Sequence, residues 1–215
     1  VGPRWGITVV PPVTASARIM CIGLNYRAHA AEGEFEVPDY PTIFGRWFGS
    51  LSVGGDEAPV PANEKGLDWE GEVAVYLGAD SSIFGYSTFN DLTARRAQKL
   101  TAQWTLGKNG DASGPMGPLV SADEVGNLAD GLSVVTRVNG TEVQKGNTRD
   151  MIFSAESIID LVGGTLTLQP GDVIVSGTPE GVGYVRTPPW LLQPGDVVEV
   201  EVERLGTLRT PIGAR

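Results

Sequence analysis

The chain has 215 residues and a formal net charge of −10, so nucleic acid and anionic membrane surfaces are poor partners. Its length fits one domain with a sizeable core, and no apolar run approaches the roughly 20 residues of a membrane-spanning helix. The single cysteine, Cys21, excludes an internal disulfide framework and favours a reducing, cytoplasmic location. The 29 glycines and 15 prolines predict many strands joined by tight turns.

The first 45 residues predict two strands, a helical turn and a loop. Apolar runs predict strands at 7–10 and 18–24, and the second of these has the composition of a strand buried on both faces. Residues 27–32 have helical composition. The polar segment 33–41 contains two prolines and predicts a loop or a lid, after which 42–44 returns to extended structure.

Two glutamates stand at the entrance of the next predicted strand, 73–77. In an extended chain residues i and i+2 point to the same face, so Glu70 and Glu72 share a face that continues into Ala74 and Tyr76, away from water. Two carboxylates beside a core are costly unless they are neutralised. A shared proton and a divalent cation would both do this, and the spacing alone leaves the two open.

Asp91 ends the following predicted strand, 82–91, and can lie at the same end of the sheet as the glutamates. Three carboxylates without a histidine form an all-oxygen site, which suits Mg²⁺, Mn²⁺ or Ca²⁺ rather than zinc. The alternative is that Glu70 and Glu72 form an ordinary solvated strand edge.

The segment 92–104 lacks glycine and proline and predicts a helix, with Asn90 or Asp91 as its cap. Lys108 then lies between glycines, so that backbone can approach a ligand and the ammonium can reach an anion. An ordinary loop lysine is the alternative. Residues 114–118, two prolines among two glycines, predict irregular structure.

Local signals are stronger in the second half of the chain. Asn139-Gly140 predicts a type I′ turn in a hairpin over 132–144, and Ser154 can cap a helix that Gly163-Gly164 ends. The segments 169–175 and 193–200 each predict a Pro-Gly turn that leads into a strand. The pattern as a whole indicates a β-rich α+β protein with mixed strand directions and two or three helices.

His29 is the only histidine, and Glu32 follows it by one helical turn. Residues i and i+3 of a helix face the same way, so this carboxylate can orient the imidazole and hold it as a base towards a water. The alternative is an exposed histidine on a polar loop.

The glycine-rich segment 177–183 follows the predicted strand that ends at Ser176. It lacks the Gly-Lys-Ser/Thr ending of a phosphate loop and opens no helix, which argues against nucleotide binding. A tight loop here can offer amides and the Thr178 hydroxyl to a carboxylate.

These motifs, in this order, resemble the fumarylacetoacetate hydrolase family, in particular its short, single-domain branch of acylpyruvases and 2-hydroxyhepta-2,4-diene-1,7-dioate isomerases. The similarity runs from about 18 to 200. It is carried by the segments 21–32 (CIGLNYRAHAAE), 68–75 (DWEGEVAV), 85–98 (GYSTFNDLTARRAQ), 103–108 (QWTLGK), 114–118 (GPMGP) and 177–183 (GTPEGVG).

The resemblance implies a fold of mixed, curled β-sheets, a β-roll or sandwich with a few short helices, that encloses a metal site. It implies one catalytic domain over 1–215 with its core at 18–200 and a lid at 25–41, in a homodimer. It also implies that Mg²⁺ or Mn²⁺ binds to three carboxylates, those of Glu70, Glu72 and Asp91.

For the chemistry, the resemblance implies that His29 and Glu32 act on the lid as the base and its orienter. The substrate's carboxylate and keto oxygens would lie among four further side chains, those of Arg95, Gln98, Lys108 and Thr178. Lys108 would place positive charge where negative charge develops.

Family members act on 2-oxo acids with a further carbonyl, by C–C hydrolysis, decarboxylation or keto–enol isomerisation. The presence of both His29 and Glu32 favours hydrolysis of an acylpyruvate-type bond. The alternatives are a decarboxylase or isomerase of a related 2-oxo diacid, and a non-catalytic protein that only binds a small oxo acid.

The chain also departs from the family pattern. Arg46 and the pair Asn109-Gly110 replace residues that are usual in the family. Both positions are expected to line the pocket, so the identity of the substrate's distal group is not determined. The crossover at 78–83 is short. The N-terminal extension of larger members is missing, which points away from the two-domain form.

Overall fold

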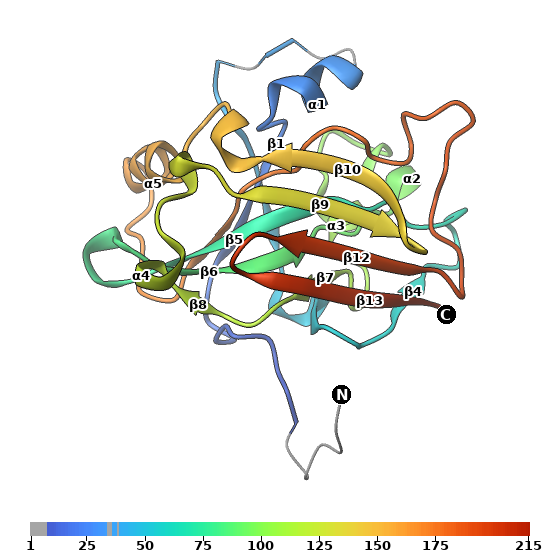
Figure 1. Ribbon diagram of the computed structural model, residues 1–215, viewed down its shortest axis with the longest axis horizontal. Coiled ribbons are helices and arrows are strands. Elements are labelled where there is room, and N and C mark those ends of the chain that lie inside the picture. Colours follow the sequence, from blue (N-terminus) through green and yellow to red (C-terminus); the bar gives the residue numbers. More distant parts are fainter. Residues whose placement is uncertain (1–7, 34–35, 38) are drawn as a thin grey trace.

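The strands form two sheets, one of eight strands and one of five. The computed structural model describes residues 8–33, 36–37 and 39–215. In Figure 1 most of the five-stranded sheet lies in front, with β5 and β6 of the larger sheet behind it. The helices are short, with α5 at one end and α1 at the top.

The eight-stranded sheet is mixed and curled. Its strands run in the order β2 (Thr42–Arg46), β1 (Ile19–Gly23), β11 (Val173–Val175), β5 (Gly71–Leu77), β6 (Ile83–Asn90), β7 (Gly114–Met116) and β3 (Leu51–Val53), and β8 (Val120–Ser121) pairs with β6. The pairs β1–β11 and β3–β7 are parallel and the others are antiparallel. Phe44 of β2 belongs to one hydrophobic cluster with Phe89 of β6 and Met116 of β7, so strands far apart in the order face each other across the curl.

The five-stranded sheet is antiparallel except at one edge. Its order is β10 (Thr141–Asn147), β9 (Ser133–Val138), β12 (Val197–Val202), β13 (Gly206–Ala214) and β4 (Ala58–Val60), and only β13 and β4 pair in parallel. Along β12 Val198, Val200 and Val202 are buried, whereas Glu201 is exposed. One face of this strand is therefore in water, as its alternating sequence predicts.

The main hydrophobic core lies between the two sheets. Val73 and Val75 of β5 pack in one cluster with Val200 of β12 and Ile158 of α5. The opposite face of β5 carries Ala74 and Tyr76, which belong to the cluster inside the curl. Because successive residues of β5 point to opposite faces, both faces of this strand are covered, and its seven residues are all buried.

Five α-helices and four 3₁₀ turns connect the strands of the described part. The helices are α1 (Arg27–Glu32), α2 (Arg95–Gln98), α3 (Thr105–Lys108), α4 (Ala122–Val125) and α5 (Ala155–Gly163), and the turns are η1 (Phe48–Ser50), η2 (Ala79–Ser81), η3 (Leu128–Asp130) and η4 (Thr148–Asp150). Within residues 8–33, 36–37 and 39–215 no helix is long and apolar enough to cross a membrane.

The local signals in the second half of the chain are confirmed. The Ser154 hydroxyl accepts the backbone N–H of Ser157 at 3.2 Å and caps α5. Asn139 and Gly140 have φ angles of 50° and 81°, as a type I′ hairpin turn requires. In the Pro-Gly turn before β11, Asp172 accepts the N–H of Gln169 at 2.9 Å, and a 2.7 Å bond closes the matching turn before β12.

The predicted helix over 92–104 is wrong. Thr93 exchanges two backbone hydrogen bonds with Asp68, of 2.9 and 3.0 Å, so the chain here is extended. The helix that follows, α2, is four residues long, and Ala94 precedes it, so neither Asn90 nor Asp91 is its cap. A tertiary pairing has overridden local helix propensity, which is a weak preference.

Two further predictions fail. Residues 114–116, expected to be irregular, form β7 because β3 offers a parallel partner. Of the strand predicted at 7–10, residues 8–10 are not in a strand, and Ile7 lies outside the described residues. The predicted loop at 33–41 has neither helix nor strand where it is described, and residues 34, 35 and 38 lie outside the description.

Candidate active site

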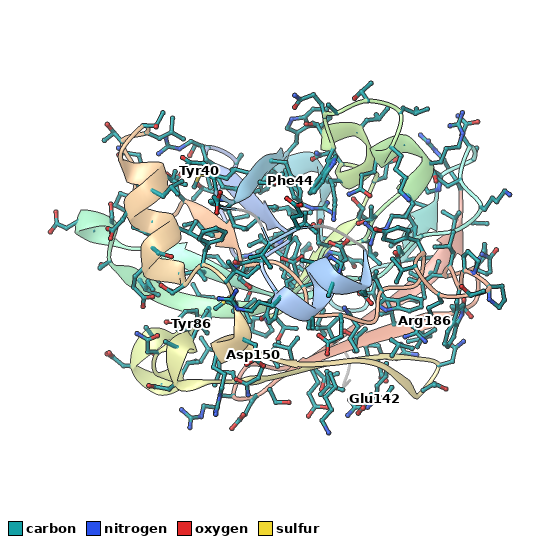
Figure 2. The ribbon with its side chains drawn as sticks, turned by 90° about the horizontal axis from the view of Figure 1, so that it is seen from above. Tyr40, Phe44, Tyr86, Glu142, Asp150 and Arg186 are labelled. Atoms are coloured by element: carbon teal, nitrogen blue, oxygen red, sulfur yellow. The ribbon has the colours of Figure 1, made fainter. Side chains whose placement is uncertain are left out.

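A cavity of about 290 Å³ lies where β5 begins, beneath α1 and beside α2 and α3. Its lining includes the charged side chains of Glu70, Glu72, Arg95 and Lys108, together with His29. In Figure 2, seen from above, α1 is the blue helix near the centre of the molecule, and the labelled Phe44 comes from β2.

Three buried carboxylates meet beside this cavity, and two of them, Glu70 and Glu72, line it. One oxygen from each of Glu70, Glu72 and Asp91 lies within 4.8 Å of the others. The antiparallel register of β5 and β6 pairs Gly71 with Asn90, and so brings the entrance of one strand to the exit of the next. The predicted meeting of these side chains at one end of the sheet is confirmed, and the solvated strand edge is excluded because all three are buried.

Glu72 is the least compensated member of the three. Its Oε2 accepts the N–H of Gly177 at 2.7 Å. Burial raises the pKa of Glu72 well above its usual value, and the charges of Asp91 and Glu70 raise it further. The cluster is therefore short of positive charge, and its hard oxygen donors are those that Mg²⁺ and Mn²⁺ prefer. The residues present fit a divalent cation.

Lys108 lies between the other two carboxylates. Its Nζ donates to Glu70 Oε2 at 2.6 Å and to Asp91 Oδ2 at 2.7 Å. Burial alone would raise the pKa of Glu70, but the charges of Lys108 and Arg95 outweigh it and lower the pKa to about 2. Glu70 is therefore held ionised by cations supplied by the chain itself.

Two arginines complete an alternating row of charges. Arg95 pairs through Nε with Asp68 Oδ2 at 2.7 Å and through its terminal nitrogen with Glu70 Oε1 at 2.6 Å. At the other end of the row, Arg46 Nε donates to Asp91 Oδ1 at 2.6 Å. Each carboxylate in the row is thereby fixed in orientation. Burying these charges costs desolvation free energy, but the arrangement keeps the cluster preorganised.

The expectation that Arg46 and Asn109-Gly110 line this cavity is wrong. Arg46 is buried behind Asp91, where it donates to the Ser113 hydroxyl at 2.9 Å. The Asn109 side chain accepts the N–H of Trp47 at 2.6 Å, outside the cavity. Neither residue lines the cavity, and only Arg46 contacts one of the three carboxylates, Asp91.

His29 and Glu32 form the expected pair. His29 Nδ1 lies 2.7 Å from Glu32 Oε1, and Glu32 Oε2 accepts the N–H of Gly181 at 2.8 Å. Because an ionised carboxylate only accepts, this contact places the imidazole proton on Nδ1 and leaves the lone pair on Nε2. His29 is buried and lines the cavity, which excludes the exposed polar loop.

The start of α1 is anchored to the body of the protein. The Asn25 side chain donates to the carbonyls of Ser176 and Phe153 at 2.7 and 3.0 Å, and the backbone of Tyr26 pairs with Met151. The histidine pair therefore stands on a helix fixed at its N-terminal end.

The amides of the loop 177–183 bind the protein's own carboxylates. Besides the contacts to Glu72 and Glu32, the N–H of Gly183 donates to Asp68 Oδ1 at 2.6 Å. Gly181 has a φ of 100°, and a Cβ there would lie 2.2 Å from the carbonyl oxygen of Val143. These three amides position site residues. The expectation that the loop offers its amides to a ligand carboxylate is therefore wrong for these three.

Thr178 and Gln98 line the cavity, as expected. The Thr178 hydroxyl donates to the Gly71 carbonyl at 3.0 Å and accepts from Gln144 Nε2 at 2.9 Å. Gln98 Oε1 accepts from Arg95 at 3.0 Å, which leaves its amide nitrogen without a partner among the described residues.

The sequence alone did not identify three residues of the site, namely Asp68, Tyr184 and Gln144. Asp68 carried a usable signal, because it precedes Glu70 by two residues and so shares its face in an extended chain. No spacing connects Tyr184 to the cavity or Gln144 to Thr178, since only the tertiary fold brings them there.

The fold is a β-rich α+β fold with a curled, mixed sheet. Together with three carboxylates and a histidine–glutamate pair around one cavity, it defines the structural class of this chain. The family model described as "Fumarylacetoacetate (FAA) hydrolase C-terminal" matches residues 18–213. The chain belongs to the fumarylacetoacetate hydrolase family, which confirms the family and the fold expected from its motifs.

Characterised relatives differ in their reactions. The chain is 40% identical over 223 residues to 2,4-didehydro-3-deoxy-L-rhamnonate hydrolase of Sphingomonas sp. (strain SKA58), covering 98% of this chain and 76% of that one. It is 38% identical over 219 residues to the human mitochondrial oxaloacetate tautomerase FAHD2A, covering 96% and 69%. The structure of fumarylacetoacetate hydrolase from Exiguobacterium antarcticum matches with a TM-score of 0.83 and 36% identity, covering 96% and 76%.

Proposed function

We propose that the chain is a divalent-metal-dependent hydrolase that cleaves a C–C bond in an acylpyruvate-type 2,4-dioxo acid. One observation carries this proposal. The buried imidazole of His29, held by Glu32, lines the same cavity as Glu70 and Glu72. A base that can activate water and a site for a cation would therefore both face a substrate bound in this cavity.

The cation would be held by the carboxylates of Glu70, Glu72 and Asp91, as Mg²⁺ or Mn²⁺. A bound divalent cation supplies Lewis-acid stabilisation of negative charge on the oxygens of a dioxo substrate. Lys108 adds a second positive charge beside it, held in place before the reaction begins.

Arg95 and Gln98 would orient the substrate's carboxylate and 2-oxo group by donating to them, and Thr178 would join them by turning its hydroxyl proton from the Gly71 carbonyl to the substrate. A guanidinium has five N–H groups. Arg95 Nε donates to Asp68 and one terminal nitrogen donates to Gln98. The other terminal nitrogen forms an ion pair with Glu70 but has no hydrogen-bond partner among the described residues, so N–H groups remain for a ligand. Holding the substrate at fixed points converts the attack of water into a reaction between preplaced groups.

In the proposed reaction His29 Nε2 takes a proton from a water, whose oxygen bonds to the distal acyl carbon. The bond between that carbon and C3 of the pyruvate unit then breaks, and its electron pair stays on the pyruvate unit as an enolate. Protonation of C3 gives pyruvate, and the acyl group leaves as a carboxylic acid. Glu32 stabilises the imidazolium that forms in the first step.

A tautomerase of a 2-oxo diacid is the second candidate, favoured by the 38% identity to oxaloacetate tautomerase FAHD2A. The same cavity would serve, with His29 moving a proton at C3 of the substrate instead of activating water. A decarboxylase and a non-catalytic oxo-acid binder are the remaining alternatives.

Product analysis tests the proposal. The protein is incubated with acetylpyruvate and with oxaloacetate, in Mg²⁺ and in excess chelator. Hydrolysis predicts pyruvate and acetate from acetylpyruvate, only with the metal. Metal-dependent enol–keto exchange of oxaloacetate without acetylpyruvate cleavage supports the tautomerase, CO₂ release supports the decarboxylase, and no turnover of either compound overturns the enzymatic proposal.

The family match over 18–213 supports one catalytic domain across the chain. As the family resemblance implies, we propose that the segment 25–41 is its lid. We further propose a homodimer, as the family resemblance implies. Light scattering after size-exclusion chromatography tests it, and a mass of about 23 kDa, that of one chain, would contradict it.

A further inference from the structure

Three cations line the cavity, and one of them lacks an anionic partner. Arg95 and Lys108 are each paired with two carboxylates. Lys99, which also lines the cavity, has no carboxylate within ion-pairing distance in the part of the chain that the structure describes. Lys99 is exposed, so its ammonium stands at the cavity opening.

An aromatic ring connects this ammonium to the buried part of the site. Lys99 Nζ lies 4.1 Å from the centroid of the Tyr184 ring, and the Arg95 guanidinium carbon lies 4.3 Å from the same centroid. Cation–π contacts of this length hold a cation in place while leaving its N–H donors free. The exposed ammonium and the buried guanidinium therefore contact the same ring.

The electrostatic surroundings favour an anion at this position. Partial burial lowers the pKa of Lys99, and the neighbouring charge of Arg95 lowers it further. The charge of Asp68 raises the pKa but does not restore its usual value, so the ammonium lacks a full counter-charge. A bound carboxylate would supply that charge in a cavity that already excludes part of the solvent. The remaining wall, formed by residues such as Ile22, Phe44 and Trp104, is apolar and gives a substrate's middle portion no competing partner.

We propose that Lys99 and Tyr184 form a subsite for a second carboxylate, so that a 2-oxo acid with a distal carboxylate binds more tightly than one with a neutral tail. This inference rests on the proposed function only for the placement of the 2-oxo end near Glu70 and Asp91. A single ammonium matches a singly charged carboxylate better than a phosphate.

Binding of two matched ligands tests the subsite without requiring turnover. 2-Oxoglutarate and 2-oxopentanoate have the same chain length and the same 2-oxo acid end, and differ only in the distal carboxylate. Calorimetry in Mg²⁺ is expected to show the wild-type protein binding 2-oxoglutarate about tenfold more tightly, the size of a charge-assisted hydrogen bond in a partly buried site.

Lys99→Met is expected to remove this preference, with affinity for 2-oxopentanoate unchanged within about twofold. Lys65→Met, an exposed lysine away from the cavity, is the matched control and keeps the preference. Tyr184→Phe keeps the ring and most of the preference, whereas Tyr184→Leu loses much of it. An inorganic phosphate that displaces 2-oxoglutarate with tighter affinity would contradict the carboxylate assignment.

Equal affinities for the two ligands in the wild type, no binding of 2-oxoglutarate, or an unchanged preference in Lys99→Met would each overturn the subsite. The proposed hydrolysis fails separately, through the absence of pyruvate release from acylpyruvates. The preference for a diacid can therefore hold where hydrolysis fails, and hydrolysis can hold where the preference fails.

Discussion

Lys108 supplies positive charge to the carboxylate cluster, so a metal ion need not supply all of it. Its ammonium touches Glu70 and Asp91, two of the three carboxylates that meet at the cavity. Buried carboxylates within a few ångströms repel each other strongly unless a cation lies between them. The chain's own lysine therefore keeps the cluster assembled before any divalent cation binds.

Lys108→Met is expected to destabilise the metal-free protein by about 3 kcal/mol, because it leaves two buried carboxylates without their shared partner. Saturating Mg²⁺ should restore part of this loss, since the cation then supplies the missing charge. Urea denaturation in chelator and in Mg²⁺ measures both effects, with Lys65→Met as a control. A variant as stable as the wild type in chelator would show that the ammonium is not needed for assembly.

His29 has a different role, which substitution separates from stability. His29→Ala is expected to lower kcat at least about 100-fold, the contribution of a positioned general base, with the thermal midpoint and Mg²⁺ affinity little changed. Glu32→Gln should cost less, because the amide oxygen can still accept from Nδ1. Steady-state kinetics with acetylpyruvate measures the effect. Unchanged turnover in His29→Ala would remove the histidine from the mechanism.

At the scale of elements, the site depends on two very short helices packed closely together. Gly107 of α3 lies against α2, where a Cβ would come within 2.5 Å of the Gln98 backbone nitrogen. The approach brings Lys108 of α3 and Arg95 of α2 to the same cavity. Neither helix has the length to be stable alone, so their mutual packing holds these cations in place.

Gly107→Ala is expected to cost about 1–3 kcal/mol by overpacking and to reduce activity further, since it pushes α2 and α3 apart. Gly163→Ala is a suitable control, because it also lies in a helix but its Cβ would meet its nearest atom only at 3.9 Å. Denaturation and kinetics on both variants separate packing from helix propensity. Equal behaviour of the two variants would contradict the importance of the close approach.

Prediction from sequence succeeded where the signal and its consequence lie within a few residues. The Asn139-Gly140 turn, the Ser154 cap and the pairing of His29 with Glu32 are all of this kind. It failed for the helix over 92–104 and for β7, because the partner strands that decide those segments are distant in sequence. Helix propensity cannot report such a partner.

The same distinction separates the site residues that local spacing predicts from those that it does not. The spacing of Glu70 and Glu72 indicates one shared face, and the end of the next strand indicates Asp91. The contact between Arg46 and Asp91 joins residues 45 positions apart without any periodic pattern, so only the curl of the sheet reveals it.

At the scale of the whole molecule, Arg18 and Asp172 tie the first strand of the core to the turn that precedes β11. Asp172 is buried and accepts hydrogen bonds from the N–H groups of Arg18 and Gln169, at 3.0 and 2.9 Å. Burial alone would raise the pKa of Asp172, but the contacts with Arg18 outweigh it and lower the pKa below its usual value.

A carboxylate with a lowered folded-state pKa stabilises the protein above its unfolded pKa of about 4, and this contribution is lost as the pH falls through the lower, folded value. Asp172→Asn should therefore destabilise the protein most at neutral pH, with the difference from the wild type shrinking below about pH 4. Denaturation midpoints from pH 7 to pH 3 measure this. Asp196→Asn, in the matching turn without an arginine, is the comparison, and a pH-independent difference for Asp172→Asn would contradict the linkage.

The cavity draws its groups from both halves of the chain. α1 supplies His29, the start of β5 supplies Glu70 and Glu72, and the loop after β11 supplies Thr178. Composition and periodicity predict the strands but not their order in the sheet, so the assembled site could be anticipated from the family's ordered motifs and not from the elements alone.

The most direct test of metal-dependent hydrolysis at this cavity follows the oxygen of water. Acetylpyruvate is incubated with the protein and Mg²⁺ in H₂¹⁸O, and the products are analysed at early times by mass spectrometry. Hydrolysis by a base-activated water predicts one ¹⁸O in the released acetate. Pyruvate should carry no more ¹⁸O than exchange with solvent introduces. Both products should be lost in His29→Ala. Unlabelled acetate, or acetylpyruvate recovered intact while its C3 hydrogens exchange with solvent faster than in protein-free buffer, would contradict hydrolysis and leave proton transfer as the reaction of this site.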